Sequence, residues 1–205
     1  MINFNQSDLD QISRAVLEAE RKTTGEIVPM IVNQSDDYPG ARWRLAIAIS
    51  LLFGFLVYSC IDYSDSVWIL WAQIPGLYIG YWLGTFDAIL RPFLSGSKID
   101  EEVHQRALQA FFSHNIHATK ERTGILIMVS LLEHRVEILA DTGINAKVSM
   151  DTWQKILAGM VNKIKSNELA DGICIAVKEC SEILEKDFPG THENPNEIKN
   201  KIIIE

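Results

Sequence analysis

Two long apolar runs occupy the middle of this chain, and they constrain its fold more than any other feature. They span Leu45–Ile61 and Val67–Phe86, and the first contains no charged residue. At about 1.5 Å per residue, a helix of this length, with its flanks, crosses a hydrocarbon core of roughly 30 Å. We therefore expect a transmembrane helical hairpin over about 45–61 and 67–89. The alternative is the buried helical hairpin of a soluble protein.

Charged residues near the two runs predict their orientation. The loop that connects the runs, residues 62–66, has no lysine or arginine. The outer ends of the pair carry Arg42, Arg44, Arg91 and Lys98. By the positive-inside rule both polar flanks are cytoplasmic, and so are the N- and C-termini of a multi-pass protein. The first 44 residues contain no secretory signal pattern, so the hairpin itself would direct insertion into the lipid bilayer.

Glycines recur every four residues in the second run, at Gly76, Gly80 and Gly84. This spacing lines one helix face with small residues and lets another backbone approach closely. Packing within the hairpin is the favoured explanation, and a homodimer seam, and hence a homo-oligomer, is the alternative. Pro75 lies just before the first glycine, and we expect a kink there because proline removes one backbone hydrogen bond.

The polar flanks are acidic. The net charge of the chain is −8, while the segment 42–91 carries as many positive as negative charges, so the excess lies outside it. This balance argues against nucleic acid as a partner. The three cysteines do not form a pattern typical of a disulfide framework or a metal site.

The flanks predict alternating helices and strands. Continuous or alternating apolar residues predict strands at Gly25–Val32, Gly124–Leu132 and Arg135–Ala140, the last antiparallel to the second, and a short edge strand within 201–204. Apolar residues at helical spacing predict helices near 7–19, 99–119, 153–164 and 169–184.

A weak repeat links the two flanks. Thr24-Gly25 and Thr123-Gly124 each follow a predicted helix and precede a predicted strand. Two such units suggest neighbouring parallel strands with the hairpin inserted in their crossover. We therefore expect one discontinuous domain, formed by 1–41 and 92–205, interrupted by the hairpin at 42–91.

Several blocks of the flanks resemble the TPM-domain family. They are Thr23–Val28, Thr123–Leu131, Arg135–Ile144, Asp171–Ile173, Phe188-Pro189 and Asn196–Ile198. That family includes thylakoid-lumen acid phosphatase-like proteins linked to photosystem II repair, a nicotinic-receptor accessory protein and many bacterial membrane proteins. The resemblance implies an α/β fold, a Rossmann-like α/β/α sandwich with a small mixed sheet. The inserted hairpin resembles a bacterial branch of the family, which implies the bacterial inner (plasma) membrane.

The sequence contains no assembled phosphatase motif. It has no Cys-x5-Arg loop, no phosphate-binding glycine loop and no His-Glu-x-x-His, and Asp8-Leu9-Asp10 opens a predicted helix. Three acids on positions that match the family pattern could converge at a strand end and hold a divalent cation: Glu26, Asp141 and Asp171. The favoured roles of the two aspartates are a turn at Asp141 and a helix first turn at Asp171.

Two other sets of residues have a metal-binding alternative. His114, His117 and Glu121 share one face of the predicted helix at i, i+3 and i+7 and could hold Zn²⁺ with a fourth ligand from elsewhere, although a solvated or partner-facing helix end is the favoured explanation. Asp151 precedes an apolar stripe and is favoured as a helix N-cap.

The sequence therefore leaves two functional classes. The favoured one is a membrane-anchored interaction or accessory module for membrane-protein maintenance, with an unidentified protein partner, no catalytic residue and no cofactor. The alternative is a weak metal-dependent acid phosphatase that uses the three acids and a divalent cation.

Overall fold

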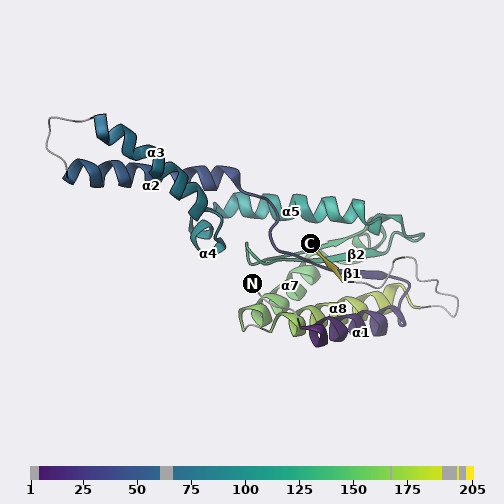
Figure 1. Ribbon diagram of the computed structural model, residues 1–205. Coiled ribbons are helices and arrows are strands. Elements are labelled where there is room, and N and C mark those ends of the chain that lie inside the picture. The colour runs from purple at the N-terminus through teal and green to yellow at the C-terminus, as the bar shows by residue number, and fades with distance from the viewer. Residues whose placement is uncertain (1–4, 61–66, 167, 191–197, 199–201) are drawn as a thin grey trace. The chain divides into compact units, whose positions relative to one another are not determined.

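The computed structural model describes residues 5–60, 67–166, 168–190, 198 and 202–205. The chain divides into two compact units, one formed by Met1–Ser35 and Glu101–Glu205 and the other by Asp36–Asp100 (Figure 1). The second unit contains the expected hairpin and is wider than 42–91 at both ends.

The larger unit contains a mixed four-stranded sheet in the order β3-β2-β1-β4. Its strands are β1 (Glu26–Val32), β2 (Gly124–Ser130), β3 (Arg135–Ala140) and β4 (Ile203–Ile204). β1 and β2 are parallel and in register along all of β1, which confirms the parallel pair that the Thr-Gly repeat predicts. β3 is antiparallel to β2, as expected. The short edge strand expected within 201–204 is β4, which pairs in parallel with β1. The α/β fold class is thereby confirmed.

The two central strands are buried on both faces. Every residue of β1 and β2 is buried, which explains why their sequences are continuous apolar runs. The helices of this unit are α1 (Gln6–Glu20), α5 (Gly96–Ser113), η3 (Ile116–Ala118), α6 (Thr142–Asn145), α7 (Met150–Lys165) and α8 (Leu169–Asp187). α8 packs against both α1 and α7, and these three helices cover one face of the sheet, while α5 covers the other (Figure 1).

Gly124 shows how closely the elements pack at the start of the central strands. A Cβ atom added there would lie 2.1 Å from the backbone oxygen of Ile116 in η3. Since such a contact is impossible, only glycine fits at the point where β2 begins. Packing therefore requires the glycine of the second Thr-Gly pair.

One helix ends earlier than its apolar pattern predicts. The helix expected over 99–119 stops at Ser113, because Asn115 adopts a left-handed conformation with φ of 57°. The expectation that His114, His117 and Glu121 share one helical face is therefore wrong.

The inserted unit contains two long helices side by side (Figure 1). Its elements are α2 (Pro39–Cys60), α3 (Val67–Leu83), α4 (Asp87–Leu90) and η2 (Arg91–Phe93). The second helix was expected to reach residue 89, but it ends at Leu83, and α4 begins after a turn. The predicted connecting loop 62–66 lies outside the described residues.

The glycine face of α3 packs against α2. A Cβ atom added to Gly76 would lie 2.8 Å from the Cα of Ser50, and one added to Gly80 would lie 2.6 Å from the Cα of Ala46. An atom added to Gly84 would lie 3.2 Å from the Cγ of Arg42. The backbones thus meet where the sequence has glycine, so packing within the hairpin explains the repeat.

Among the described helices, α2 alone is long and apolar enough to cross a membrane. It has 22 residues, a mean hydropathy of 1.7 in its apolar window, and only 22% of that window is buried inside the structure. α3 has 17 described residues. By length and composition, the structure therefore supports one of the two expected spans.

Candidate functional site

Two of the three predicted acids lie at the same end of the sheet. Glu26 opens β1 opposite Gly124 of β2, and Asp141, directly after β3, donates its backbone N–H to the Gly124 oxygen over 2.9 Å. The three residues therefore form a row across the sheet. At about 4.8 Å per strand, the backbones of Glu26 and Asp141 are roughly 10 Å apart.

Glu26 is buried and lies beside a second carboxyl group. Only 3% of its surface is exposed, and its neighbour is Glu20, the last residue of α1. Burial, together with the charge of Glu26, raises the pKa of Glu20 to about 8. An oxygen of Glu20 accepts the backbone N–H of Ile27 over 3.4 Å. At neutral pH the pair therefore holds one proton between two carboxyl groups.

Asp141 has the turn-forming role that the sequence favours. Its side chain is 2% exposed, and Oδ1 accepts the backbone N–H of Thr142 over 2.6 Å, which caps the short helix α6. Arg122, which has a left-handed backbone with φ of 58°, places its guanidinium 3.2 Å from the same oxygen. The other oxygen, Oδ2, is buried and has no hydrogen-bond partner among the described residues.

Asp171 does not join the other two acids. It lies in the first turn of α8 and accepts a hydrogen bond from the side chain of Gln11 over 2.8 Å. Leu184, near the opposite end of α8, lies against Gly25 at the start of β1. At about 1.5 Å per residue, Asp171 is therefore roughly 20 Å from that point along the helix. The expectation that the three acids converge at one strand end is wrong, since α8 carries Asp171 away.

No metal centre is assembled in the part of the chain that the structure describes. That part contains no group of three or more histidine, cysteine, aspartate or glutamate side chains placed to hold a metal ion. His104 pairs with Glu137 of β3 over 2.9 Å, and His117 packs on the ring of Phe112 at a centroid distance of 5.0 Å. Asp151 is in the first turn of α7, and the N-cap is Ser149. The expectation that Asp151 is the N-cap is therefore wrong by two residues.

A further buried acid, in the turn between β2 and β3, lies at the opposite end of β2. Glu133 is 1% exposed and accepts the backbone N–H of Ser35 over 2.8 Å. The hydroxyl of Ser130 donates to the other carboxylate oxygen, and that of Ser35 lies 3.1 Å from Ser130. This cluster ties the segment after β1 to the end of β2. Sequence reasoning missed it because Ser35 and Glu133 are nearly a hundred positions apart.

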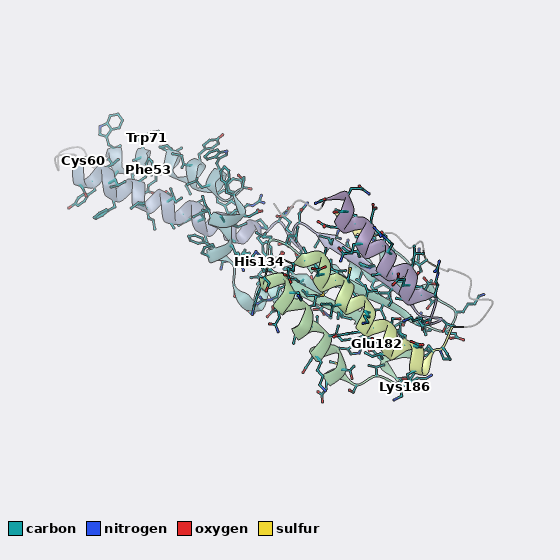
Figure 2. The ribbon with its side chains drawn as sticks, turned by 90° about the horizontal axis from the view of Figure 1, so that it is seen from below. Phe53, Cys60, Trp71, His134, Glu182 and Lys186 are labelled. Atoms are coloured by element: carbon teal, nitrogen blue, oxygen red, sulfur yellow. The ribbon has the colours of Figure 1, made fainter. Side chains whose placement is uncertain are left out.

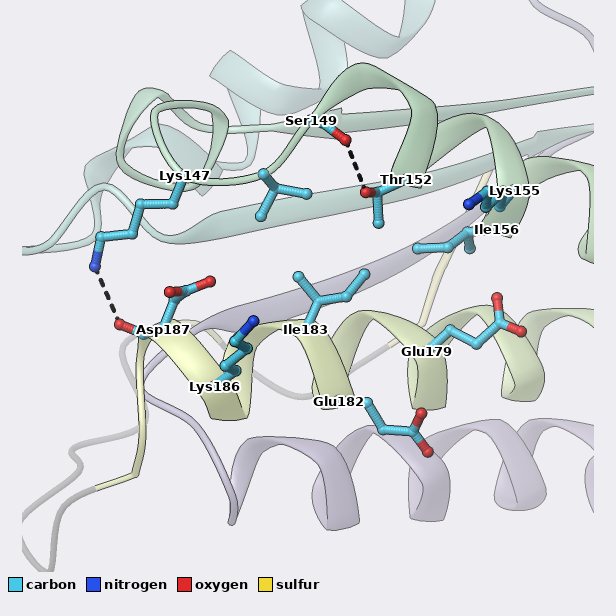
Figure 3. A pocket seen from close by; sticks show the side chains of 11 residues that line it. Lys147, Ser149, Thr152, Lys155, Ile156, Glu179, Glu182, Ile183, Lys186 and Asp187 are labelled. Carbon is cyan, nitrogen blue, oxygen red and sulfur yellow. Dashed lines mark hydrogen bonds between the residues drawn. The ribbon is translucent and has the colours of Figure 1, made fainter.

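An open groove of about 570 Å³ lies between the start of α7 and the end of α8 (Figure 3). Val148, Ile156 and Ile183 supply its apolar surface. Its polar lining consists of Lys147, Ser149, Thr152, Lys155, Glu179, Glu182, Lys186 and Asp187. The groove therefore mixes both charge signs and has no excess of either.

The polar groups of this groove are arranged for helix packing. Lys147 donates to the backbone oxygen of Asp187 over 3.1 Å (Figure 3). Its ammonium group also lies 4.0 Å from the centre of the Phe188 ring. Ser149 and Thr152 hydrogen bond to each other over 3.0 Å. The two hydroxyls are thus engaged with one another, and the lysine ties α8 to the segment before α7.

These observations define a class of protein. The larger unit is an α/β sandwich with a small mixed sheet, and a helical pair is inserted in the crossover between its two parallel strands. Residues 94–183 match the family model described as TPM domain. This match confirms the resemblance to the TPM-domain family seen in the sequence. The structure adds β1, which precedes the matched residues, to the same sheet.

A solved structure supports the fold. The chain is similar to the BA42 protein from the psychrophilic bacterium Bizionia argentinensis, whose structure was determined by NMR, with a TM-score of 0.63 and 19% sequence identity. The similarity covers 98% of this chain and 95% of that chain. At this identity it shows the fold alone. No curated protein matches the sequence significantly.

Proposed function

We propose that this protein is a membrane-anchored interaction module of the bacterial inner membrane. The helices α2 and α3 form the anchor, and the TPM domain works on the cytoplasmic side as an accessory to the maintenance of other membrane proteins. The N- and C-termini are both cytoplasmic in this proposal.

The apolar surface of the two long helices carries the proposal. Large apolar side chains extend from both of them, as Figure 2 shows for Trp71. Those more than half exposed are Trp43, Ile47, Leu51, Leu52, Phe55, Val67, Trp68, Leu70, Trp71, Ile74, Tyr78 and Trp82. At roughly 100 Å² each they expose on the order of 1,000 Å², whereas the largest patch of a soluble monomer is roughly 300–600 Å². Burying this surface in lipid is worth roughly 25 kcal/mol.

The distribution of basic residues supports the orientation. Arg42 and Arg44 begin α2, while Arg91 and Lys98 follow α3. Residues 62–66, at the other end of the hairpin, contain no lysine or arginine. Cytoplasmic loops are the ones enriched in these residues, so this distribution favours cytoplasmic flanks.

Membrane extraction tests the anchor. The full chain, produced in bacteria, is expected to stay with the membrane pellet after an alkaline carbonate wash. Replacing Phe55 and Trp71 by lysine should release a larger fraction of the chain than the wild type loses, because each buried lysine costs roughly 3 kcal/mol of the roughly 25 kcal/mol that burial in lipid supplies. Lysine at Leu17 and Leu108, exposed apolar positions outside the hairpin, is the matched control and should leave the protein in the pellet. A wild-type chain that washes off the membrane would contradict the proposal.

A weak metal-dependent acid phosphatase is the second candidate. The observation in its favour is the buried Oδ2 of Asp141, which has no hydrogen-bond partner in the described residues and lies at the same sheet end as Glu26. A divalent cation would be its cofactor. Hydrolysis of a generic phosphoester with Mg²⁺, Mn²⁺ or Ca²⁺ tests it, and activity lost in Asp141→Asn with the fold retained would favour it over the interaction role.

A further inference from the structure

The outer edge of β1 is closed by a very short strand of the same chain. β2 pairs with β1 along its full length, but β4 pairs with only Met30 and Ile31 on the opposite side. An open strand edge presents backbone donors and acceptors that another strand can bind. The contacts that hold β4 at this edge therefore indicate which kind of strand the edge can bind.

The first half of this edge cannot accept a strand. Ile27, Pro29, Ile31 and Asn33 direct their backbone groups to it, since alternate residues of a parallel strand face the same neighbour. Pro29 has no N–H, and the N–H of Ile27 is donated to the carboxyl group of Glu20. Only the stretch from Met30 to Asn33 is left to bind a partner strand.

The backbone of Glu205 is bound by that stretch of β1, and the side chain of Glu205 is bound by residues near α5. The N–H of Glu205 donates to the Ile31 oxygen over 3.0 Å, and its carbonyl oxygen accepts the N–H of Asn33 over 2.9 Å. Its carboxylate pairs with Arg106 of α5 and lies 3.4 Å from Nε2 of His114. A second hydrogen bond, 3.1 Å from Arg106 to Gln109, orients the guanidinium. The site thus binds a short parallel strand whose last residue has an acidic side chain.

We propose that this edge is an acceptor site for a partner protein segment with two β-branched apolar residues followed by a carboxylate. The inference rests on the interaction role proposed above and names its partner class. Residues 203–205 have this chemistry and occupy the site as an internal ligand, held by a two-residue ladder and the contacts of Glu205. Addition of a strand to a sheet edge is a common mode of peptide recognition.

A binding assay on the purified full chain in detergent tests the site. The probe is a fluorescent peptide with the sequence of residues 198–205, and the variant is Glu205→Lys, whose lysine is repelled by Arg106. Because a tethered segment competes at an effective concentration on the order of 1 mM, releasing it should tighten peptide binding at least tenfold. Glu185→Lys, the same charge change at an exposed position of α8, should bind as weakly as the wild type.

Further variants test the chemistry of recognition. A peptide whose last residue is lysine should not bind Glu205→Lys. Adding Arg106→Glu to Glu205→Lys re-forms the internal pair with reversed charges and should return binding to the wild-type level. If Glu205→Lys does not fold, Glu205→Gln should show a smaller gain in the same direction.

Two results would overturn the inference. One is a folded Glu205→Lys protein that binds the peptide no better than the wild type or binds the lysine-ended peptide equally well. The other is a wild-type dimer that Glu205→Lys dissociates, which would make the occupant a second copy. The assay needs no membrane, so its failure is distinguishable from a failure of the anchor, which carbonate extraction measures separately.

Discussion

Replacing Glu20 by glutamine should remove a pH dependence from the stability of this protein. In the folded chain the pKa of Glu20 is raised from 4.5 to about 8, chiefly by burial and then by the charge of Glu26. Between these two values the folded state holds a proton that the unfolded state has lost. Stability is therefore full below pH 4.5 and falls as the pH rises toward 8.

The magnitude follows from the single proton. One proton corresponds to at most about 1.4 kcal/mol per pH unit, and a few kcal/mol over the whole interval. Glutamine is neutral at every pH, can accept the N–H of Ile27 as Glu20 does, and can donate to Glu26. Glu20→Gln should therefore match the wild type near pH 5 and exceed its stability by a few kcal/mol near pH 8.5.

Thermal unfolding of the purified chain at pH 5 to 9 measures this difference. The control is Glu18→Gln, an exposed position on the same helix, which should leave the wild-type profile unchanged. If Glu20→Gln loses stability with pH as steeply as the wild type does, the buried carboxyl pair is not the source and the reasoning is refuted.

Three further predictions concern packing and the strand-end acid. Gly80→Val should destabilise the hairpin by about 1–3 kcal/mol in denaturant unfolding, because a Cβ at this position would lie 2.6 Å from the α2 backbone. By contrast, Gly159→Ala should stabilise α7 by up to ~1 kcal/mol, because there is open space around Gly159. Arg122→Ala should lower the unfolding midpoint by the equivalent of about 1–3 kcal/mol, since it removes the cation beside the buried Asp141, and an unchanged midpoint would contradict that pairing. Asp141→Asn should leave phosphoester hydrolysis at the background level of the wild type; a measurable wild-type rate that the variant loses would support catalysis instead.

Much of the fold could be predicted from the sequence because the signals were local. Both central strands begin at or directly after a Thr-Gly pair, and the structure confirms the parallel pairing that this repeat predicted. The alternation in Arg135–Ala140 predicted an antiparallel neighbour, and β3 is one. The glycine spacing predicted close helix packing, and the structure shows that this face of α3 packs against α2.

The candidate site was less predictable because it depends on where helices end and which way they run. Asn115 breaks a helix whose apolar pattern continues, so the proposed histidine face does not form. Asp171 has a family-like motif, but the direction of α8 takes it away from Asp141. The Glu20–Glu26 pair joins a helix end to a strand start, and no spacing rule could have indicated that the two side chains would be buried together.

The most direct test of the account is the location of both chain ends and of the loop 62–66. Reporters that work only inside or only outside the cell can be fused to the N-terminus, to the C-terminus and within 62–66 of the full chain. A membrane hairpin in a split cytoplasmic domain predicts that both ends report the inside and the loop reports the outside. Two ends on opposite sides, or a loop that reports the inside, would contradict it.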